Sequence, residues 1–378
     1  MLNLRNSVIK ICKRLLKTGI LALLLFTLSI GLSAAWWNGG NTPTRQSRLP
    51  QGDPIKDGKA LLRYALPIDN EPVRKIQGSL EDISNRLRAK RWTPVSSDIS
   101  AASRVLSISK PKLLASVPES RQSEAEAIIA KLDEGIINIK EVAEVKDGEQ
   151  VLEQRAELLK LVGQLEQLMV EGFPFEVPSE FSNLAQLKGR ATIEMETNQG
   201  SLTLVVDGYS APVTAGNFVD LVQRGFYDGL EFIRSEESYV LQAGDPPGPE
   251  VGFIDPDSGE YRNIPLEILV KGDEEPIYSL TLEEIGRFRE QPVLPFSAYG
   301  AVAMARPEDE NDGGSSQFFF FLFQPELTPA GVNLLDGRYT VFGYVVEGKK
   351  VLEELGKGDK IISAKVVDGL ENIVEPEA

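Results

Sequence analysis

The period of the hydrophobic pattern changes once along the chain, at residues 173–181, and this change constrains the fold more than any other feature. Upstream of it, apolar residues recur every three or four positions, which is the period of an amphipathic α-helix. Downstream, apolar and polar residues alternate, as in "RATIEMET" (190–197), which is the period of a half-buried strand. The two prolines of "FPFEVPSEF" separate the patterns. The sequence therefore predicts an all-α domain followed by a β domain.

The upstream half is expected to form a bundle of about four or five helices, including helices within 71–90, 95–108, 124–145 and 149–172. Apolar residues share one face on each of the two later helices: Ile128, Ile129, Leu132, Ile136 and Ile139 on one, and Leu152, Leu159, Val162, Leu165 and Met169 on the other. Each stripe could be a groove for a partner, but burial in the bundle core is the simpler explanation.

The downstream half begins with a β-hairpin, in which the turn "NQG" follows "RATIEMET" and precedes "SLTLVV". An amphipathic helix is predicted between Pro212 and Gly225. Further strands are expected at 230–234, 238–242, 300–304, 317–323 and 339–346, and an extra helix at "TLEEIGRFRE" (281–290). Many short strands, few helices and long Gly/Pro loops favour a closed antiparallel barrel.

The N-terminal segment has the composition of a signal peptide. It is rich in Lys and Arg, has no acidic residue before Asp53, and contains an apolar run at 19–32 followed by "SAA". We expect cleavage after Ala35 and export of an acidic chain across a membrane. An uncleaved membrane anchor is the alternative, although the run is short for a span.

The composition excludes several kinds of site. The chain has no histidine and its only cysteine is Cys12, which rules out Ser-His-Asp and Cys-His catalysis, imidazole zinc sites and internal disulfides. Its formal net charge of −16 argues against nucleic acid as a partner. The acidic loops at 255–260 and 308–314 lack the final glutamate of a calcium loop and are interpreted as solvated surface. No metal or cofactor is predicted.

Five blocks of the downstream half occur in a familiar order: "PVTAGNFVDLVQRGFYDGLEFIR", "YVLQAGD", "AVAMAR", "SSQFFFF" and "LLDGRYTVFGYVVEG". Together they resemble the cyclophilins, the β-barrel peptidyl-prolyl cis-trans isomerases, over about residues 188–370. The eight-residue spacing of Arg234 and Gln242 matches without a gap. The resemblance implies a cyclophilin-like antiparallel β-barrel with flanking helices, and an enzyme that isomerises Xaa-Pro bonds without a cofactor.

The resemblance also implies roles for individual residues. Arg234 would be the catalytic guanidinium, and Gln242 would brace it and help to hold the substrate carbonyl. The substrate-binding residues would be Phe232, Tyr239, Val240, Ala305, Arg306, Gln317, Phe319, Leu335, Tyr339 and Phe342. Of these, Tyr239, Val240, Phe319, Leu335 and Phe342 would line the proline pocket, and Gln317 with the backbone of Ala305 and Arg306 would hold the extended peptide. In "FFFF" (318–321) alternate rings must point to opposite faces of the strand, so at most two can line a pocket.

The domain boundaries expected from these patterns are a signal peptide at 1–35, a linker at 36–53, the helical bundle at 54–172, a second linker at 173–187, the barrel at 188–370 and a tail at 371–378. Tyr239, Val240, Arg306 and Tyr339 depart from the residues that cyclophilins usually have, and the loop at 306–314 is longer and more acidic. These departures predict low or restricted activity.

The leader, the helical half and motifs such as "QPVLPF" are most similar to the multidomain cyclophilins of the thylakoid lumen and of cyanobacteria. That resemblance implies a lumenal or periplasmic protein, soluble or peripherally bound to the membrane once the leader is removed. It implies proline-containing clients, photosystem II subunits among them, and a helical domain that can restrict the site. The alternative is a non-catalytic chaperone or assembly scaffold built on the same fold.

Overall fold

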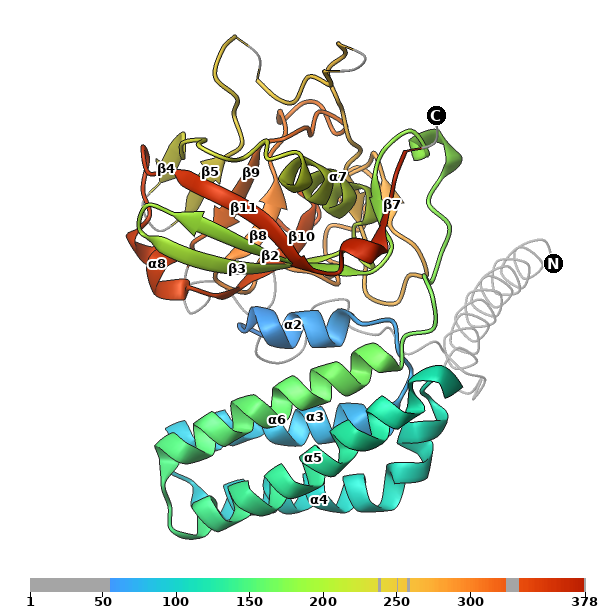
Figure 1. Cartoon of the computed structure of the whole chain (residues 1–378), viewed down its shortest axis with the longest axis vertical. Coiled ribbons are helices and arrows are strands. Elements are labelled where there is room, and N and C mark those ends of the chain that lie inside the picture. Colours follow the sequence, from blue (N-terminus) through green and yellow to red (C-terminus); the bar gives the residue numbers. More distant parts are fainter. Residues whose placement is uncertain (1–54, 237–238, 250, 257–258, 324–332, 377–378) are drawn as a thin grey trace, which may run out of the picture. The chain divides into compact units, whose positions relative to one another are not determined.

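The computed structural model describes residues 55–236, 239–249, 251–256, 259–323 and 333–376 (Figure 1). The signal peptide expected at 1–35 and the linker expected at 36–53 lie outside these residues. The described residues belong to one compact unit, Leu49–Ala378. No helix among them is both long and apolar enough to span a membrane.

The helical half of the described chain forms the predicted bundle. Its helices are α2 (Gly58–Ala65), α3 (Glu71–Arg88), α4 (Trp92–Ala115), α5 (Gln122–Glu144) and α6 (Gly148–Leu168). The apolar faces of α3 to α6 bury a common core that includes Val73, Ile76, Leu80, Ile99, Leu106, Ile129, Leu132, Ile139, Val162 and Leu165. The assignment of the apolar stripes to a bundle core is therefore confirmed for most of their residues.

Two details of the bundle differ from the prediction. Helix α4 continues past the expected end and through Pro111, because Leu113 in its last turn is fully buried in the core. Proline removes the hydrogen bond to only one carbonyl, and burial of Leu113 compensates for that loss. The expected core residue Leu152 is 43% exposed, and its neighbour Val151 is fully buried in its place.

The β half is built on one curled antiparallel sheet, with strands in the order β11, β2, β3, β10, β8, β9, β5 and β4 (Figure 1). Their bounds are β2 Arg190–Thr197, β3 Gly200–Asp207, β4 Arg234–Glu236, β5 Val240–Ala243, β8 Ala301–Met304, β9 Phe318–Phe321, β10 Val341–Glu347 and β11 Ile361–Asp368. Backbone hydrogen bonds join residues 229–232 to 358–361, so segments beside the two outer strands meet.

Smaller elements complete this half. Helix α7 (Pro212–Gln223) packs its apolar residues into the interior cluster of the sheet, and α8 (Lys349–Glu354) follows β10. Two short antiparallel ladders pair β1 (Gln186–Leu187) with β12 (Ile373–Val374), and β6 (Glu267–Ile268) with β7 (Ile277–Tyr278). The prediction of a helix at 281–290 is wrong, because this segment forms turns. Gly286 has a φ of 73°, and the Arg287 amide donates to the Leu282 carbonyl, which closes the segment after one turn.

The sheet buries side chains on both of its faces, and the four phenylalanines of β9 divide between them. Phe318 and Phe320 belong to the interior cluster with α7, whereas Phe319 and Phe321 belong to a second cluster on the other face. The alternation predicted for "FFFF" is confirmed. We refer to the second set as the outer cluster; its buried members are Leu61, Leu62, Ala65, Val240, Leu294, Phe296, Ala298, Ala301, Ala303, Phe319, Phe321, Val341 and Tyr344.

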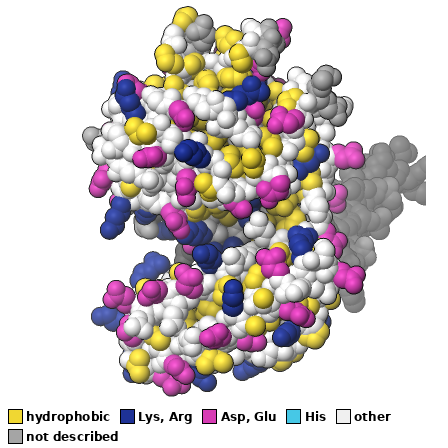
Figure 2. Space-filling model, viewed as in Figure 1, with side chains coloured by type: hydrophobic (Ala, Val, Ile, Leu, Met, Phe, Trp, Pro, Cys, Tyr) yellow, Lys and Arg dark blue, Asp and Glu magenta, His cyan; other side chains and the backbone are white. Residues whose placement is uncertain are grey.

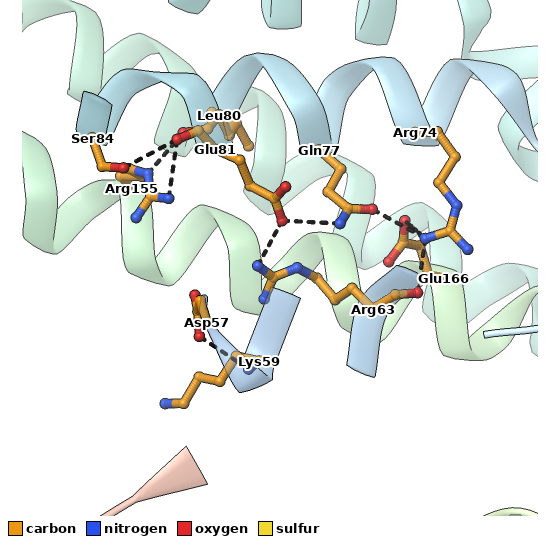
Figure 3. Close-up of polar contacts among 10 residues, drawn as sticks. All are labelled: Asp57, Lys59, Arg63, Arg74, Gln77, Leu80, Glu81, Ser84, Arg155 and Glu166. Carbon is orange, nitrogen blue, oxygen red and sulfur yellow. Dashed lines mark hydrogen bonds and ion pairs between the residues drawn. The ribbon is translucent and has the colours of Figure 1, made fainter. Parts of the chain in front are cut away.

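Helix α2 contributes to the outer cluster and is also bonded to the bundle. Leu61, Leu62 and Ala65 pack against the sheet, and the guanidinium of Arg190 in β2 donates to the carbonyl of Leu62. On its other side, Arg63 pairs with Glu81 of α3 at 2.8 Å (Figure 3). This short helix therefore connects the two halves.

Arg74 of α3 fixes the end of α2 and meets a buried carboxylate. Its guanidinium donates to the carbonyl of Arg63 and to Oε1 of Glu166 in α6 at 3.0 Å (Figure 3). It also donates to the carbonyl of Leu66. The side chain of Glu166 has no exposed surface, and its Oε2 has no hydrogen-bond partner among the described residues. Burial raises the pKa of Glu166 to about 7.

Candidate substrate site

Arg234 and Gln242 stand opposite each other in a hairpin at one end of the sheet. β4 pairs with β5 so that the Cα atoms of these two residues are direct ladder partners. The spacing of eight in the sequence is therefore the distance around one hairpin. The Arg234 side chain is exposed, and Gln242 is half-buried. The ladder thus places a solvent-facing guanidinium beside a carboxamide.

A short chain of amide hydrogen bonds runs from Gln242 away from Arg234. Nε2 of Gln242 donates to Oε1 of Gln317 at 2.6 Å. Nε2 of Gln317 donates in turn to Oδ1 of Asp245 at 2.8 Å and to the carbonyl of Val251 at 2.7 Å. The amide of Ala305 donates to the carbonyl of Gln317, which ties β8 to this chain. Gln242, Gln317 and Ala305 are therefore brought together.

An aromatic surface lies on the same side of the sheet. Phe319 is the ladder partner of Gln242, and its ring meets Tyr339 edge to face at 5.7 Å between centroids. Val240 is buried in the outer cluster, and Tyr239, Leu335, Tyr339 and Ala305 are partly buried against it. The structure thus collects these predicted pocket residues on one surface, next to the Arg234–Gln242 pair.

Two predicted residues lie elsewhere. Phe232 is 1% exposed and Phe342 is fully buried, and both belong to the interior cluster. The ring of Phe342 packs against Phe218 of α7 at 5.1 Å. Phe342 points away from its neighbour Val341, which belongs to the outer cluster, because successive residues of a strand point to opposite faces. Phe232 and Phe342 are therefore not part of the surface beside Arg234 and Gln242.

Arg306 anchors the acidic loop. Its guanidinium donates to the carbonyls of Pro307 at 2.8 Å and Arg338 at 2.8 Å, and lies 5.2 Å from the centre of the Tyr339 ring. Further along the loop, Oδ1 of Asp312 accepts from the Leu266 amide at 3.1 Å. These contacts hold the loop as a wall of a cavity of about 540 Å³, which Gln242, Gln317, Arg306 and Glu310 help to line.

The long insertion between β5 and β8 supports this wall through a buried carboxylate. Glu267 in β6 accepts hydrogen bonds from the amides of Val213 and Thr214 at the start of α7, at 3.0 and 2.7 Å. Its own amide donates to Oγ1 of Thr340, next to Tyr339. Burial raises the pKa of Glu267 to about 7, although the hydrogen bonds from Thr214 and Val213 oppose this effect.

Sequence reasoning missed Phe296 and Leu294, which cover part of the aromatic surface. The Phe296 ring stacks on Phe319 with centroids 6.0 Å apart and planes 4° from parallel. Its amide donates to Oδ1 of Asp336 at 2.8 Å, in the loop that carries Leu335; burial raises the pKa of Asp336 to about 6. The alternation of Leu294, Phe296 and Ala298 was a signal of a buried extended segment.

A nucleic-acid partner would require a patch of Lys and Arg side chains on the surface. On the face shown in Figure 2, Lys and Arg side chains are interspersed with Asp and Glu side chains and form no basic patch. Among the described residues, no cluster of three or more carboxylate or thiol side chains is arranged to hold a metal ion.

Comparison with known proteins identifies both halves. Residues 57–170 match the PsbQ-like domain of CYP38-like peptidyl-prolyl cis-trans isomerases, and residues 192–372 match the cyclophilin-type peptidyl-prolyl cis-trans isomerases. A homologue from Synechocystis sp., named as a thylakoid lumen peptidyl-prolyl cis-trans isomerase, is 58% identical over 96% of each chain.

Two relatives from Arabidopsis thaliana are more distant. The chloroplastic peptidyl-prolyl cis-trans isomerase CYP38 is 47% identical over 87% of this chain and 78% of its own. The chloroplastic CYP37 is 33% identical over 85% of this chain and 71% of its own. With both halves matched in order and a relative similar along almost its full length, the chain belongs to the cyclophilin-type peptidyl-prolyl cis-trans isomerases, in the group that carries a CYP38-like N-terminal helical domain.

Proposed function

We propose that Arg234 is the group through which this isomerase accelerates rotation about Xaa-Pro bonds. The bond has partial double-bond character, with a barrier of about 18–20 kcal/mol and uncatalysed isomerisation over roughly tens to hundreds of seconds. No covalent bond has to break. The enzyme need only favour the twisted state, in which amide resonance is lost and the prolyl nitrogen becomes able to accept a hydrogen bond.

A guanidinium suits this task because it stays protonated and presents a planar set of donors. A hydrogen bond that forms only in the twisted state stabilises the transition state and not the ground state. A rate increase of about four decades requires roughly 5.5 kcal/mol. The observation that carries the proposal is the position of Arg234, opposite Gln242 and next to the outer-cluster surface.

The other residues would bind the peptide. Phe319, Val240, Tyr239, Leu335 and Tyr339 would receive the proline ring on an apolar surface, which excludes water from the twisting bond. Gln242, Gln317 and the backbone at Ala305 and Arg306 would hold the extended chain on either side of the proline.

The test is NMR exchange spectroscopy on a short Xaa-Pro peptide with the mature chain. We expect Arg234→Ala to abolish catalysis and Arg234→Lys to restore little of it, because lysine lacks the planar fork. Arg289→Ala, which removes an exposed arginine that lies over Phe288, is the matched control and should change nothing. Equal exchange rates with the wild-type chain and with Arg234→Ala would refute the role of Arg234.

We further propose that the clients are exported or lumenal proteins, photosystem II subunits among them. The homologue from Synechocystis sp. is named for the thylakoid lumen, and the two plant relatives are chloroplastic. The second candidate is a non-catalytic assembly scaffold, favoured by the large helical domain and by the anchored acidic loop. If Arg234→Ala abolishes peptide exchange but restores assembly in a deletion strain, the scaffold role is the cellular one.

A further inference from the structure

The carboxamide of Gln317 is oriented by the two groups that its nitrogen contacts. Nε2 donates to Oδ1 of Asp245 at 2.8 Å and to the carbonyl of Val251 at 2.7 Å. An ionised carboxylate and a backbone carbonyl can accept hydrogen bonds but cannot donate them. Both hydrogens of the Gln317 amide group are therefore used, and the oxygen must face the other way.

This orientation fixes Gln242. The Gln317 oxygen lies 2.6 Å from the side chain of Gln242, and only a donor can satisfy it. Gln242 must present its Nε2 there, which directs its own carbonyl oxygen away from Gln317. Gln242 is the ladder partner of Arg234, whose guanidinium has donors and no acceptor. The oxygen of Gln242 is thus kept for a donor, either the guanidinium or a peptide N–H.

We propose that Asp245 is a positioning residue for the isomerisation, and this rests on the function proposed for Arg234. Asp245 acts through Gln317 and, together with the Val251 carbonyl, sets the direction of these amide hydrogen bonds. If the direction of these side-chain hydrogen bonds were reversed, the amide nitrogen of Gln242 would face the guanidinium, and two donors would meet. The Gln242 oxygen would then no longer be available to accept from Arg234 or from a peptide N–H.

The test inverts the polarity at the end of the chain. In Asp245→Lys the ammonium can only donate, so it favours the reversed orientation of Gln317, against the preference of the Val251 carbonyl. We expect kcat/KM for the peptide to fall about tenfold, the value of one hydrogen bond. Asp245→Asn keeps an oxygen that can accept from Gln317 and should stay within about twofold of the wild-type chain. Asp133→Lys makes the same change of charge on the exposed face of α5, in the helical bundle, and should leave the rate unaltered.

A double-mutant cycle separates positioning from a general effect. In a Gln242→Ala background, Asp245→Lys should cost nothing further, because its effect passes through Gln242. Equal losses in both backgrounds would overturn the proposal, and so would a loss in Asp245→Asn as large as in Asp245→Lys. The second result would mean that the charge of Asp245 matters and not its hydrogen bond.

A readout that needs no turnover keeps this test independent of the role of Arg234. The side-chain NH₂ resonances of Gln242 report whether its nitrogen is hydrogen-bonded. They should shift in Asp245→Lys and return in Asp245→Asn, even if no variant isomerises the peptide. Unchanged Gln242 resonances in a folded Asp245→Lys chain would refute the positioning role, whereas the activity of Arg234→Ala alone tests the catalytic one. If Asp245→Lys fails to fold, Asp245→Ala gives the same comparisons with a smaller effect.

Discussion

Glu166 is expected to make the protein more stable as the pH falls towards 5. Its carboxyl is fully buried between α2, α3 and α6, and one of its oxygens is bonded to Arg74. The charged and titratable groups that face it are Arg63 and Tyr64 of α2, Arg74 and Glu81 of α3, and Arg190 of β2. Burial outweighs the attraction of these arginines and raises the pKa of Glu166 from 4.5 to about 7.

The sign follows from the two pKa values. Between 4.5 and about 7 the folded chain holds a proton on Glu166 that the unfolded chain has released. The free energy of unfolding therefore falls as the pH rises through this window. The stabilisation is fully present below the unfolded pKa and is lost above the folded one. A shift of this size corresponds to about 3 kcal/mol across the window.

The measurement is urea unfolding, followed by the helical circular dichroism signal, at intervals between about pH 5 and about pH 8. Glu166→Gln removes the titrating group, so its free energy of unfolding should depend on pH less steeply, by about 3 kcal/mol over the window. Glu157→Gln, on the exposed face of the same helix, is the matched control and should follow the wild-type chain. The reasoning fails if Glu166→Gln and the wild-type chain lose stability in parallel as the pH rises.

Three further predictions concern packing and capping. Phe296→Ala should lower the free energy of unfolding by about 3–5 kcal/mol and raise KM for the peptide, because it removes the ring stacked on Phe319. An unchanged urea unfolding curve would contradict this. Gly58→Ala should destabilise the chain, because a Cβ there would lie 2.8 Å from Cβ of Tyr344. Gly78→Ala, in open space on α3, should stabilise it by about 1 kcal/mol. Thermal unfolding compares the two variants, and equal shifts of the melting temperature would refute the steric argument. Glu267→Gln should lower the free energy of unfolding by about 1–3 kcal/mol, because the two carboxylate oxygens accept from the amides of Val213 and Thr214 and glutamine has only one such oxygen. Amide hydrogen exchange in α7 measures the loss, and unaltered protection would show that these hydrogen bonds are dispensable.

Sequence patterns predicted the elements whose stability is local. The hairpin of β2 and β3, the helices α3 to α6 and the two faces of "FFFF" follow from period and turn chemistry alone. The same rule of alternation, applied to β10, would have placed Phe342 opposite Val341 and so inside the barrel. The role expected for Phe342 came from the resemblance to cyclophilins and not from its position in the strand. That position decides which face of the sheet its ring occupies.

Other features could not be read from local pattern because distant residues decide them. α2 has only eight residues, too few to be stable alone, and it is helical because Leu61 and Leu62 are buried against strands far along the chain. The direction of the hydrogen bonds between Gln242 and Gln317 depends on Asp245 and also on the Val251 carbonyl, which no spacing rule connects to either amide. In contrast, 281–290 has a helical pattern, but Gly286 and the contacts of Arg287 with Asp273 and Glu290 hold it as turns.

The position of α2 has a consequence for the order in which the chain folds. Ser297 bonds to the carbonyl of Ile55 across 242 residues, and Gly58 contacts Tyr344 in β10. Because synthesis runs from the N-terminus, α2 is made long before β10. Helices α3 to α6 can bury their core at once, but the apolar face of α2 must wait for nearly the whole chain. Among the described helices, the first to be synthesised is thus among the last to complete its packing.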